Sequence, residues 1–114
     1  VRAYEYQELD DKAKIGDSYA RIGVIYKQQG DYKKALEHYT KSLAILEEIG
    51  DRPGMGACHG NIGSIYDEQD KYENALSHYS KSLEIYDEVG DKKGMGACYN
   101  SIGNIHMKQG NHEK

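Results

Sequence analysis

Apolar side chains recur along the chain at the spacing of amphipathic helices. Two stripes in the first half of the sequence each follow a period near 3.6 residues. The first stripe consists of Ile15, Tyr19, Ile22, Gly23 and Tyr26, and the second of Tyr32, Ala35, Leu36, Tyr39, Leu43, Leu46 and Ile49. The pattern predicts two consecutive helices, and no segment shows the alternation that is typical of a strand.

Glycine and aspartate mark where these helices end and begin. Gly30 is followed by Asp31, and Gly50 by Asp51, so a glycine can close one helix and an aspartate can cap the next. Pro53 then fits the first turn of a helix. These signals predict helices over about residues 12–29, 32–49, 52–69, 72–89 and 92–109, with a short one near 2–9.

The chain contains an internal sequence repeat with a period of 40 residues. The segment "GDSYARIGVIYKQQGDYKKALEHYT" aligns with "GACHGNIGSIYDEQDKYENALSHYS", and a third copy begins "GACYNSIGNIHMKQG". We expect a first repeat at 12–51, a second at 52–91 and the first helix of a third at 92–114. Residues 1–11 are interpreted as the remnant of the second helix of a preceding repeat. Because the first residue is Val rather than Met, we expect a piece of a longer array.

The repeated positions resemble the tetratricopeptide repeat signature. That signature is an aromatic residue, then a Leu-Gly pair, Tyr, Gly, Tyr, Ala and a second aromatic residue, and here Ile takes the place of Leu at the family's spacings. The first copy supplies Tyr19, Ile22, Gly23, Tyr26, Gly30, Tyr32, Ala35 and Tyr39. The second copy departs at His59 and Asp70, and the third at His106. Asp70 replaces the turn glycine, and we expect the turn to survive because aspartate tolerates the left-handed conformation.

This resemblance implies an all-α fold of tandem antiparallel helical hairpins that form a right-handed α-superhelix. The family period is about 34 residues, whereas the period here is 40. The longer repeat resembles those of kinesin light chains and Pins-type signalling modulators. It also resembles the repeats of many bacterial repeat proteins.

Composition narrows the class of protein further. Neither Trp nor Phe occurs, so eleven tyrosines must supply the aromatic part of the core. The formal net charge is −4 and no run of Lys or Arg exceeds two residues, so we expect no nucleic-acid partner. The longest apolar runs span only a few residues, so we expect no membrane association and a cytoplasmic location.

The stretch "GMGACHG" at 54–60 raises the question of a phosphate or thiol site. A phosphate-binding glycine loop follows a strand, and none precedes Gly54. The recurrence of the stretch as "GMGACYN" at 94–100 favours packing instead. Cys58 and Cys98 occupy equivalent positions about one repeat apart, too far for a disulfide, and we expect both to be free thiols.

No arrangement of residues indicates catalysis, a metal or a cofactor. A zinc site needs three or four converging ligands, whereas Cys58 and His59 are neighbours on a helix and point about a hundred degrees apart. The Ser, His, Asp and Glu residues recur with the repeat, as scaffold positions do. We therefore expect no metal, no cofactor and no enzymatic activity in this segment.

Function is then expected to reside in the concave groove. By the resemblance, the first helix of each hairpin lines this groove, and its exposed positions differ between copies although the packing positions do not. A position that the fold does not fix is available to a ligand, and the alternative is that it is merely solvated. The predicted groove residues are Arg21, Val24, Lys27, Asn61, Ser64, Asp67, Glu68, Asn100, Asn104 and Lys108.

The chemistry of these residues favours a particular class of ligand. Asparagine amides can hold a peptide backbone by donating and accepting at once, and Asp67 and Glu68 are expected to favour some basic residues. Chaperone-type tetratricopeptide domains bind an acidic carboxyl terminus through lysines and asparagines. Ala20, Val24 and Gly60 stand at the matching places, so we expect no binding of such a tail.

The alternative function is a self-associating structural array. Repeats need a neighbour on each face, and we expect Ile102, Ile105 and Met107 to lack one. End-to-end stacking into a homo-oligomer is therefore the second hypothesis. A regulatory or catalytic domain in flanking sequence is a weaker third.

Overall fold

Five α-helices make up the computed structural model, which describes residues 2–113. They are α1 (Arg2–Gln28), α2 (Tyr32–Ile49), α3 (Arg52–Glu68), α4 (Tyr72–Val89) and α5 (Lys92–Glu113). No strand occurs within the described residues, so the all-α prediction is confirmed. Val1 and Lys114, at the outer ends of the first and last predicted segments, lie outside the described residues.

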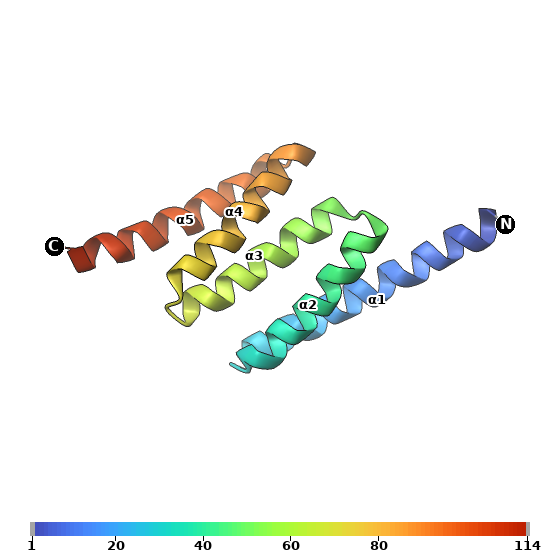
Figure 1. Cartoon of the computed structure of the whole chain (residues 1–114), viewed down its shortest axis with the longest axis horizontal. Helices are drawn as coiled ribbons and strands as arrows, with labels where there is room; N and C mark the ends of the chain where they lie inside the picture. Colours follow the sequence, from blue (N-terminus) through green and yellow to red (C-terminus); the bar gives the residue numbers. More distant parts are fainter. Residues whose placement is uncertain (1, 114) are drawn as a thin grey trace.

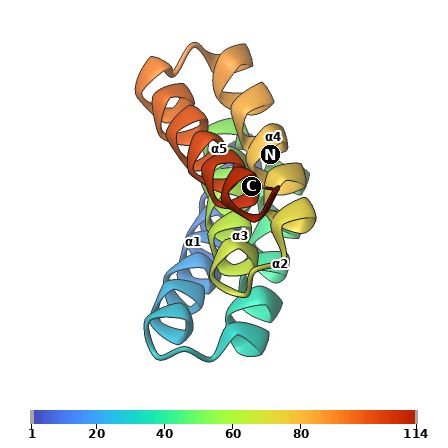
Figure 2. The same cartoon turned by 90° about the vertical axis from the view of Figure 1, so that its left-hand side faces the viewer.

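Consecutive helices run antiparallel and pack in pairs, α1 with α2 and α3 with α4, while α5 packs on α4 (Figure 1). In the end-on view, α1, α3 and α5 form one layer and α2 and α4 form the other (Figure 2). The molecule extends 63 × 32 × 17 Å. This is the helical solenoid expected from the repeat, and the hand of its superhelix stays a prediction.

The turns follow the glycine and aspartate signals. Gly50 and Gly90 close α2 and α4 with φ of 74° and 75°, values that favour glycine. The carboxylate of Asp51 accepts a hydrogen bond from the Gly54 amide at 3.0 Å, which caps α3. Asp70 adopts φ of 60°, the only non-glycine residue with positive φ among those described, so the prediction for this turn is confirmed.

The separate helix predicted at 2–9 is wrong, because residues 2–28 form one continuous helix. Asp10 and Asp11 occupy the places that Gly50 and Asp51 occupy one repeat later. Aspartate enters the left-handed conformation that ends α2 and α4 less readily than glycine, and at position 10 the helix continues. Residues 2–11 therefore extend the first helix of the hairpin and do not form a preceding second helix.

The core is built where the layers meet. One cluster of buried side chains lies among α1, α2 and α3, around the fully buried Ala35 and Tyr39. A second lies among α3, α4 and α5 and includes Ala75, Tyr79 and Ile105. The prediction that Ile102 and Ile105 lack a partner is wrong, because both pack into this second cluster. Met107 is 70% exposed, as expected.

At some glycines of the repeat, tyrosine rings pack in the space that a Cβ atom would occupy. A Cβ at Gly63 would lie 2.9 Å from Cδ1 of Tyr79, and one at Gly56 would lie 3.1 Å from Cε1 of Tyr86. Gly60 is less crowded, with only the Ser82 hydroxyl within reach. The packing interpretation of "GMGACHG" therefore agrees with the structure, although side chains rather than backbones fill most of the space.

Within residues 2–113, no helix has both the length and the apolar content that crossing a bilayer requires.

Candidate functional site

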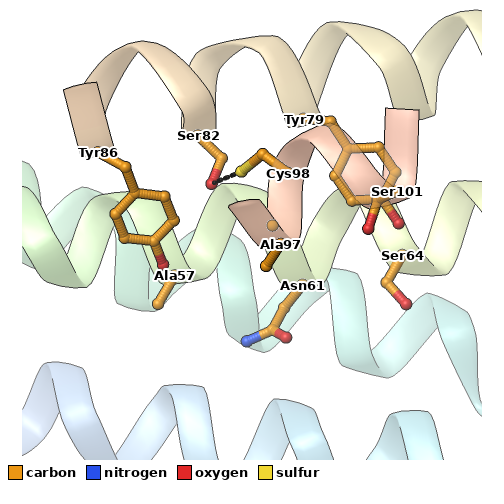
Figure 3. Close-up of a pocket in the computed structure, with 10 residues that line it drawn as sticks. Ala57, Asn61, Ser64, Tyr79, Ser82, Tyr86, Ala97, Cys98 and Ser101 are labelled. Atoms are coloured by element: carbon orange, nitrogen blue, oxygen red, sulfur yellow. Dashed lines mark hydrogen bonds between the residues drawn. The ribbon is translucent and has the colours of Figure 1, made fainter. Parts of the chain in front are cut away.

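The first cavity on the groove face lies among α3, α4 and α5 and has a volume of about 290 Å³. Small and hydroxyl-bearing side chains line it (Figure 3). They are Ala57, Gly60, Asn61, Ser64, Tyr79, Ser82, Tyr86, Ala97, Cys98 and Ser101. Two predicted site residues, Asn61 and Ser64, therefore share one cavity.

A second cavity lies between α1 and α3, near the start of α2, and has a volume of about 520 Å³. Its lining is more polar and carries charges of both signs. The residues are Val24, Lys27, Gln28, Gly30, Tyr32, Tyr39, Asn61 and Glu68. Four predicted site residues, Val24, Lys27, Asn61 and Glu68, meet here.

A third, smaller cavity of about 150 Å³ repeats the first one 40 residues earlier. Ser42, Leu46 and Cys58 take the places of Ser82, Tyr86 and Cys98. Asn61 lines all three cavities, and its side chain stands between successive first helices of the hairpins. Of the predicted site residues, Asn61 is therefore the most central to the groove.

Ion pairs join neighbouring helices of the groove layer. Lys108 on α5 lies 2.9 Å from Asp67 on α3, whose side chain is only 18% exposed. Lys27 on α1 lies 3.8 Å from Glu68. Because each carboxylate already has a lysine counter-ion, their charges are balanced locally. The expectation that Asp67 and Glu68 attract basic residues is therefore not supported by this arrangement.

The remaining predicted residues lie apart from these cavities. Arg21 is exposed and pairs with Asp17 one turn away on the same helix, at 2.9 Å. Asn100 and Asn104 are exposed on α5 and line none of the three cavities. The structure thus joins the predicted residues of α3 to Val24 and Lys27 of α1 and to Lys108 of α5, but not to Arg21, Asn100 or Asn104.

Buried serines connect three successive helices below the groove. Ser82 on α4 donates a hydrogen bond to the Gly56 carbonyl at 2.8 Å and accepts one from the Cys98 thiol at 3.3 Å (Figure 3). Ser42 makes the same contacts with Gly16 and Cys58, at 2.7 and 3.6 Å. Both cysteines are buried free thiols, as predicted. Burial raises the pKa of Cys58, which disfavours the reactive thiolate.

Two equivalent tyrosines have different surroundings, and the sequence-based prediction missed both. Tyr79 lines the first cavity together with Ser64 and Ser101 (Figure 3). The hydroxyl of Tyr39 is buried and has no hydrogen-bond partner. Burial raises the pKa of Tyr39 to about 12. The signal was present in the repeat alignment, because Val24 and Asn61 stand where Ser64 and Ser101 stand one repeat later.

A pair of imidazoles between α3 and α4 was also missed. Nδ1 of His59 lies 3.2 Å from Nδ1 of His78, and the His78 ring stacks on Tyr66. Burial lowers both pKa values, that of His78 to about 4. The alignment offers a signal here too, since Tyr19 and His38 stand at the same places and are in contact. Among the described residues, no three His, Cys, Asp or Glu side chains converge as metal ligands would.

Comparison with known proteins identifies the family. A family model of the tetratricopeptide repeat matches residues 14–88 and residues 59–114, which together cover most of the chain. A search of curated proteins finds no significant match. The family match does not test the resemblance to the variants of kinesin light chains and Pins-type proteins, which stays a prediction. Signature, fold and family model agree, and the chain belongs to the tetratricopeptide repeat family.

Proposed function

We propose that this chain is a scaffold that binds an extended or helical segment of a partner protein in the groove formed by α1, α3 and α5. Tetratricopeptide repeats generally mediate protein–protein interaction and are in general non-enzymatic scaffolds. The groove cavities are lined by hydroxyls and amides, and its acidic groups are paired with lysines. A segment that offers backbone and uncharged polar groups fits this lining better than a strongly charged one.

The observation that carries the proposal is the position of Asn61. Its amide lines all three cavities, so a segment lying across the groove would pass it whichever cavity it enters. An amide both donates and accepts, and it can therefore hold a peptide unit without reading the adjacent side chain. Asn104 lies on the same layer, on α5, at the repeat position of Ser64, and would offer a second amide to a segment that continues past the cavities.

The test is selection of peptides from a random displayed library on the purified chain, followed by calorimetry of the selected peptides. The Asn61→Ala, Asn104→Ala double variant should bind them about 5- to 150-fold more weakly, since two desolvated amide contacts contribute about 1 to 3 kcal/mol. Asn74→Ala provides a matched control, because Asn74 is exposed on α4 in the other layer. Helical content should not change in either variant. Full-strength binding by the double variant would exclude the groove.

The second candidate function is self-association through the two end faces. On α1, Ile15 and Ile25 are 49% and 52% exposed, and on α5 Tyr99 is 59% exposed. A Cβ at Gly96 or Gly103 would meet nothing within 4 Å, whereas the equivalent Gly56 and Gly63 are in close contact with tyrosines. The two end faces therefore carry apolar surface that the interior repeat buries.

Light scattering over a range of concentrations tests this second candidate. A mass that rises with concentration, and that Tyr99→Glu returns to the monomer value, is expected. A strict monomer at all concentrations would contradict it. Several expectations stay predictions from the sequence. They are the cytoplasmic location and the expectation that the chain has no nucleic-acid partner, no membrane association, no cofactor and no metal.

A further inference from the structure

Two tyrosines that the repeat makes equivalent have different neighbours at the groove. Tyr39 and Tyr79 are separated by 40 residues and both pack a ring against a helix glycine. The serine hydroxyls of Ser64 and Ser101 line the same cavity as Tyr79. Val24 replaces the first of these serines, and the Tyr39 hydroxyl is left with less than 1 Å² of exposed surface and no partner.

An unpaired buried hydroxyl is costly and uncommon in folded proteins. A phenylalanine would fill the same space without that cost. Tyr39 lines the cavity between α1 and α3, so the hydroxyl lies at the wall of a site that a bound segment could enter. Val24, which is 37% exposed, and the half-buried Asn61 line the same cavity from the neighbouring helices. Binding at the hydroxyl requires that side chains of the cavity wall rotate to uncover it.

The rest of this cavity determines what kind of group fits. Glu68 pairs with Lys27, so an acidic oxygen is present together with its counter-ion. Asn61 adds one acceptor and one donor. The Tyr39 hydroxyl therefore offers a hydrogen-bond donor that has no acceptor. Oxygens of Glu68 and Asn61 offer acceptors elsewhere on the cavity wall, and the lining has no net charge.

We propose that this cavity is a subsite for a side-chain carboxamide, a glutamine or asparagine of the segment held in the groove; this rests on the proposed function. The carboxamide oxygen accepts the hydrogen bond from the Tyr39 hydroxyl, and the carboxamide nitrogen donates to oxygens of Glu68 or Asn61. A carboxylate would satisfy Tyr39 but would face Glu68, and an apolar group would leave the hydroxyl unpaired. Since Tyr39 is the only tyrosine of the described residues whose hydroxyl is buried without a partner, the subsite occurs once among them and would fix the register of the segment.

The first test compares the two tyrosines in the unbound protein. Tyr79→Phe removes a hydroxyl that shares a cavity with two serine hydroxyls and should lower the Tm by about 3 to 6 °C. Tyr39→Phe removes an unpaired one and should leave the Tm unchanged or raise it. An equal loss in both variants would overturn the proposal, because it would mean that an ordered water already pairs with Tyr39.

The second test uses small probes that need no partner protein. N-acetylglutamine methylamide is titrated into the labelled chain and followed by NMR, with N-acetylmethionine methylamide and N-acetylglutamate methylamide as controls that keep the same backbone amides. Binding of the glutamine compound in the millimolar range is expected, at least about fivefold tighter than either control. The shifts should centre on the Asn61 amide and the Val24 methyl groups.

Two variants connect the binding to the hydroxyl. Tyr39→Phe should abolish the preference for glutamine, and so should Val24→Ser, which places a serine near Tyr39 at the position that Ser64 occupies one repeat later. Val24→Ser should also raise the Tm in the parent chain more than in the Tyr39→Phe background. Equal binding of the three compounds, or a glutamine preference that survives both variants, would overturn the subsite. Neither result depends on whether peptides selected on the groove bind through Asn61 and Asn104.

Discussion

Replacing Gly63 with alanine would test how closely α3 and α4 approach. The added Cβ would lie 2.9 Å from Cδ1 of Tyr79 and 3.2 Å from the carbonyl oxygen of Ala75. Tyr79 is only 6% exposed, so either its ring or the two helices would have to shift to admit the methyl group. Gly103 stands at the same repeat position on α5, and a Cβ there would meet nothing within 4 Å.

The matched pair isolates the steric cost. In both helices alanine is favoured over glycine by about 1 kcal/mol, and this contribution cancels in the comparison. Overpacking of a filled contact costs about 1 to 3 kcal/mol. Gly103→Ala should therefore stabilise the protein by about 1 kcal/mol, and Gly63→Ala should fall below it by about 1 to 3 kcal/mol. Gly23→Ala should behave like Gly63→Ala, because its Cβ would lie 3.0 Å from the Tyr39 ring.

Urea unfolding followed by circular dichroism would measure these differences from the midpoints at constant slope. If Gly63→Ala and Gly103→Ala stabilised the protein equally, the close approach of the Tyr79 ring to α3 would be refuted. A changed slope would show that the substitution alters the unfolded ensemble and not the contact.

Three further predictions concern the imidazole pair, the buried serines and the ligand class. The folded pKa values of His59 and His78 lie below the unfolded value near 6.5, so stability should fall as the pH drops from about 6.5 to about 4. The full His78 shift corresponds to roughly 3 kcal/mol, and partial exposure reduces the expected loss of stability to about 1 to 2 kcal/mol. In His78→Gln, the midpoint of urea unfolding should depend less on pH across this range. Ser82→Ala should lower the free energy of unfolding by about 1 to 2 kcal/mol in urea, whereas Ser80→Ala on the exposed side of α4 should change it little. A peptide ending in an acidic chaperone-type tail should show no binding in calorimetry, and micromolar affinity would contradict the expectation drawn from Ala20, Val24 and Gly60.

The sequence predicted the bounds of the helices well where a glycine followed by an aspartate separates two helices. The bounds of α2 and α4 agree with prediction because Gly50 and Gly90 can adopt the left-handed conformation that ends a helix. The prediction was wrong at Asp10, where the same register carries no glycine and the helix continues. Asp70 shows that aspartate can take this conformation, so the residue type alone does not decide between a turn and a continuous helix.

The site was less predictable, because the groove depends on how successive hairpins are placed. Repeat variation correctly drew attention to Val24, Asn61 and Ser64, which line cavities in the structure. It could not foresee that Lys108 would pair with Asp67, since that contact spans two repeats and depends on the angle between α3 and α5. Nor does an exposed position identify a ligand contact, as the placement of Asn100 on the outer part of α5 illustrates.

The serine contacts have a mechanical consequence. Each second helix packs on its own first helix along a long interface and on the next hairpin along a smaller interface. In that smaller interface, the Ser82 hydroxyl bridges Gly56 and Cys98, and the Ser42 hydroxyl bridges Gly16 and Cys58. Tension along the 63 Å axis would load these junctions in series and would leave the hairpins themselves less strained. Under tension, the array should therefore extend by separation of neighbouring hairpins before any hairpin unfolds.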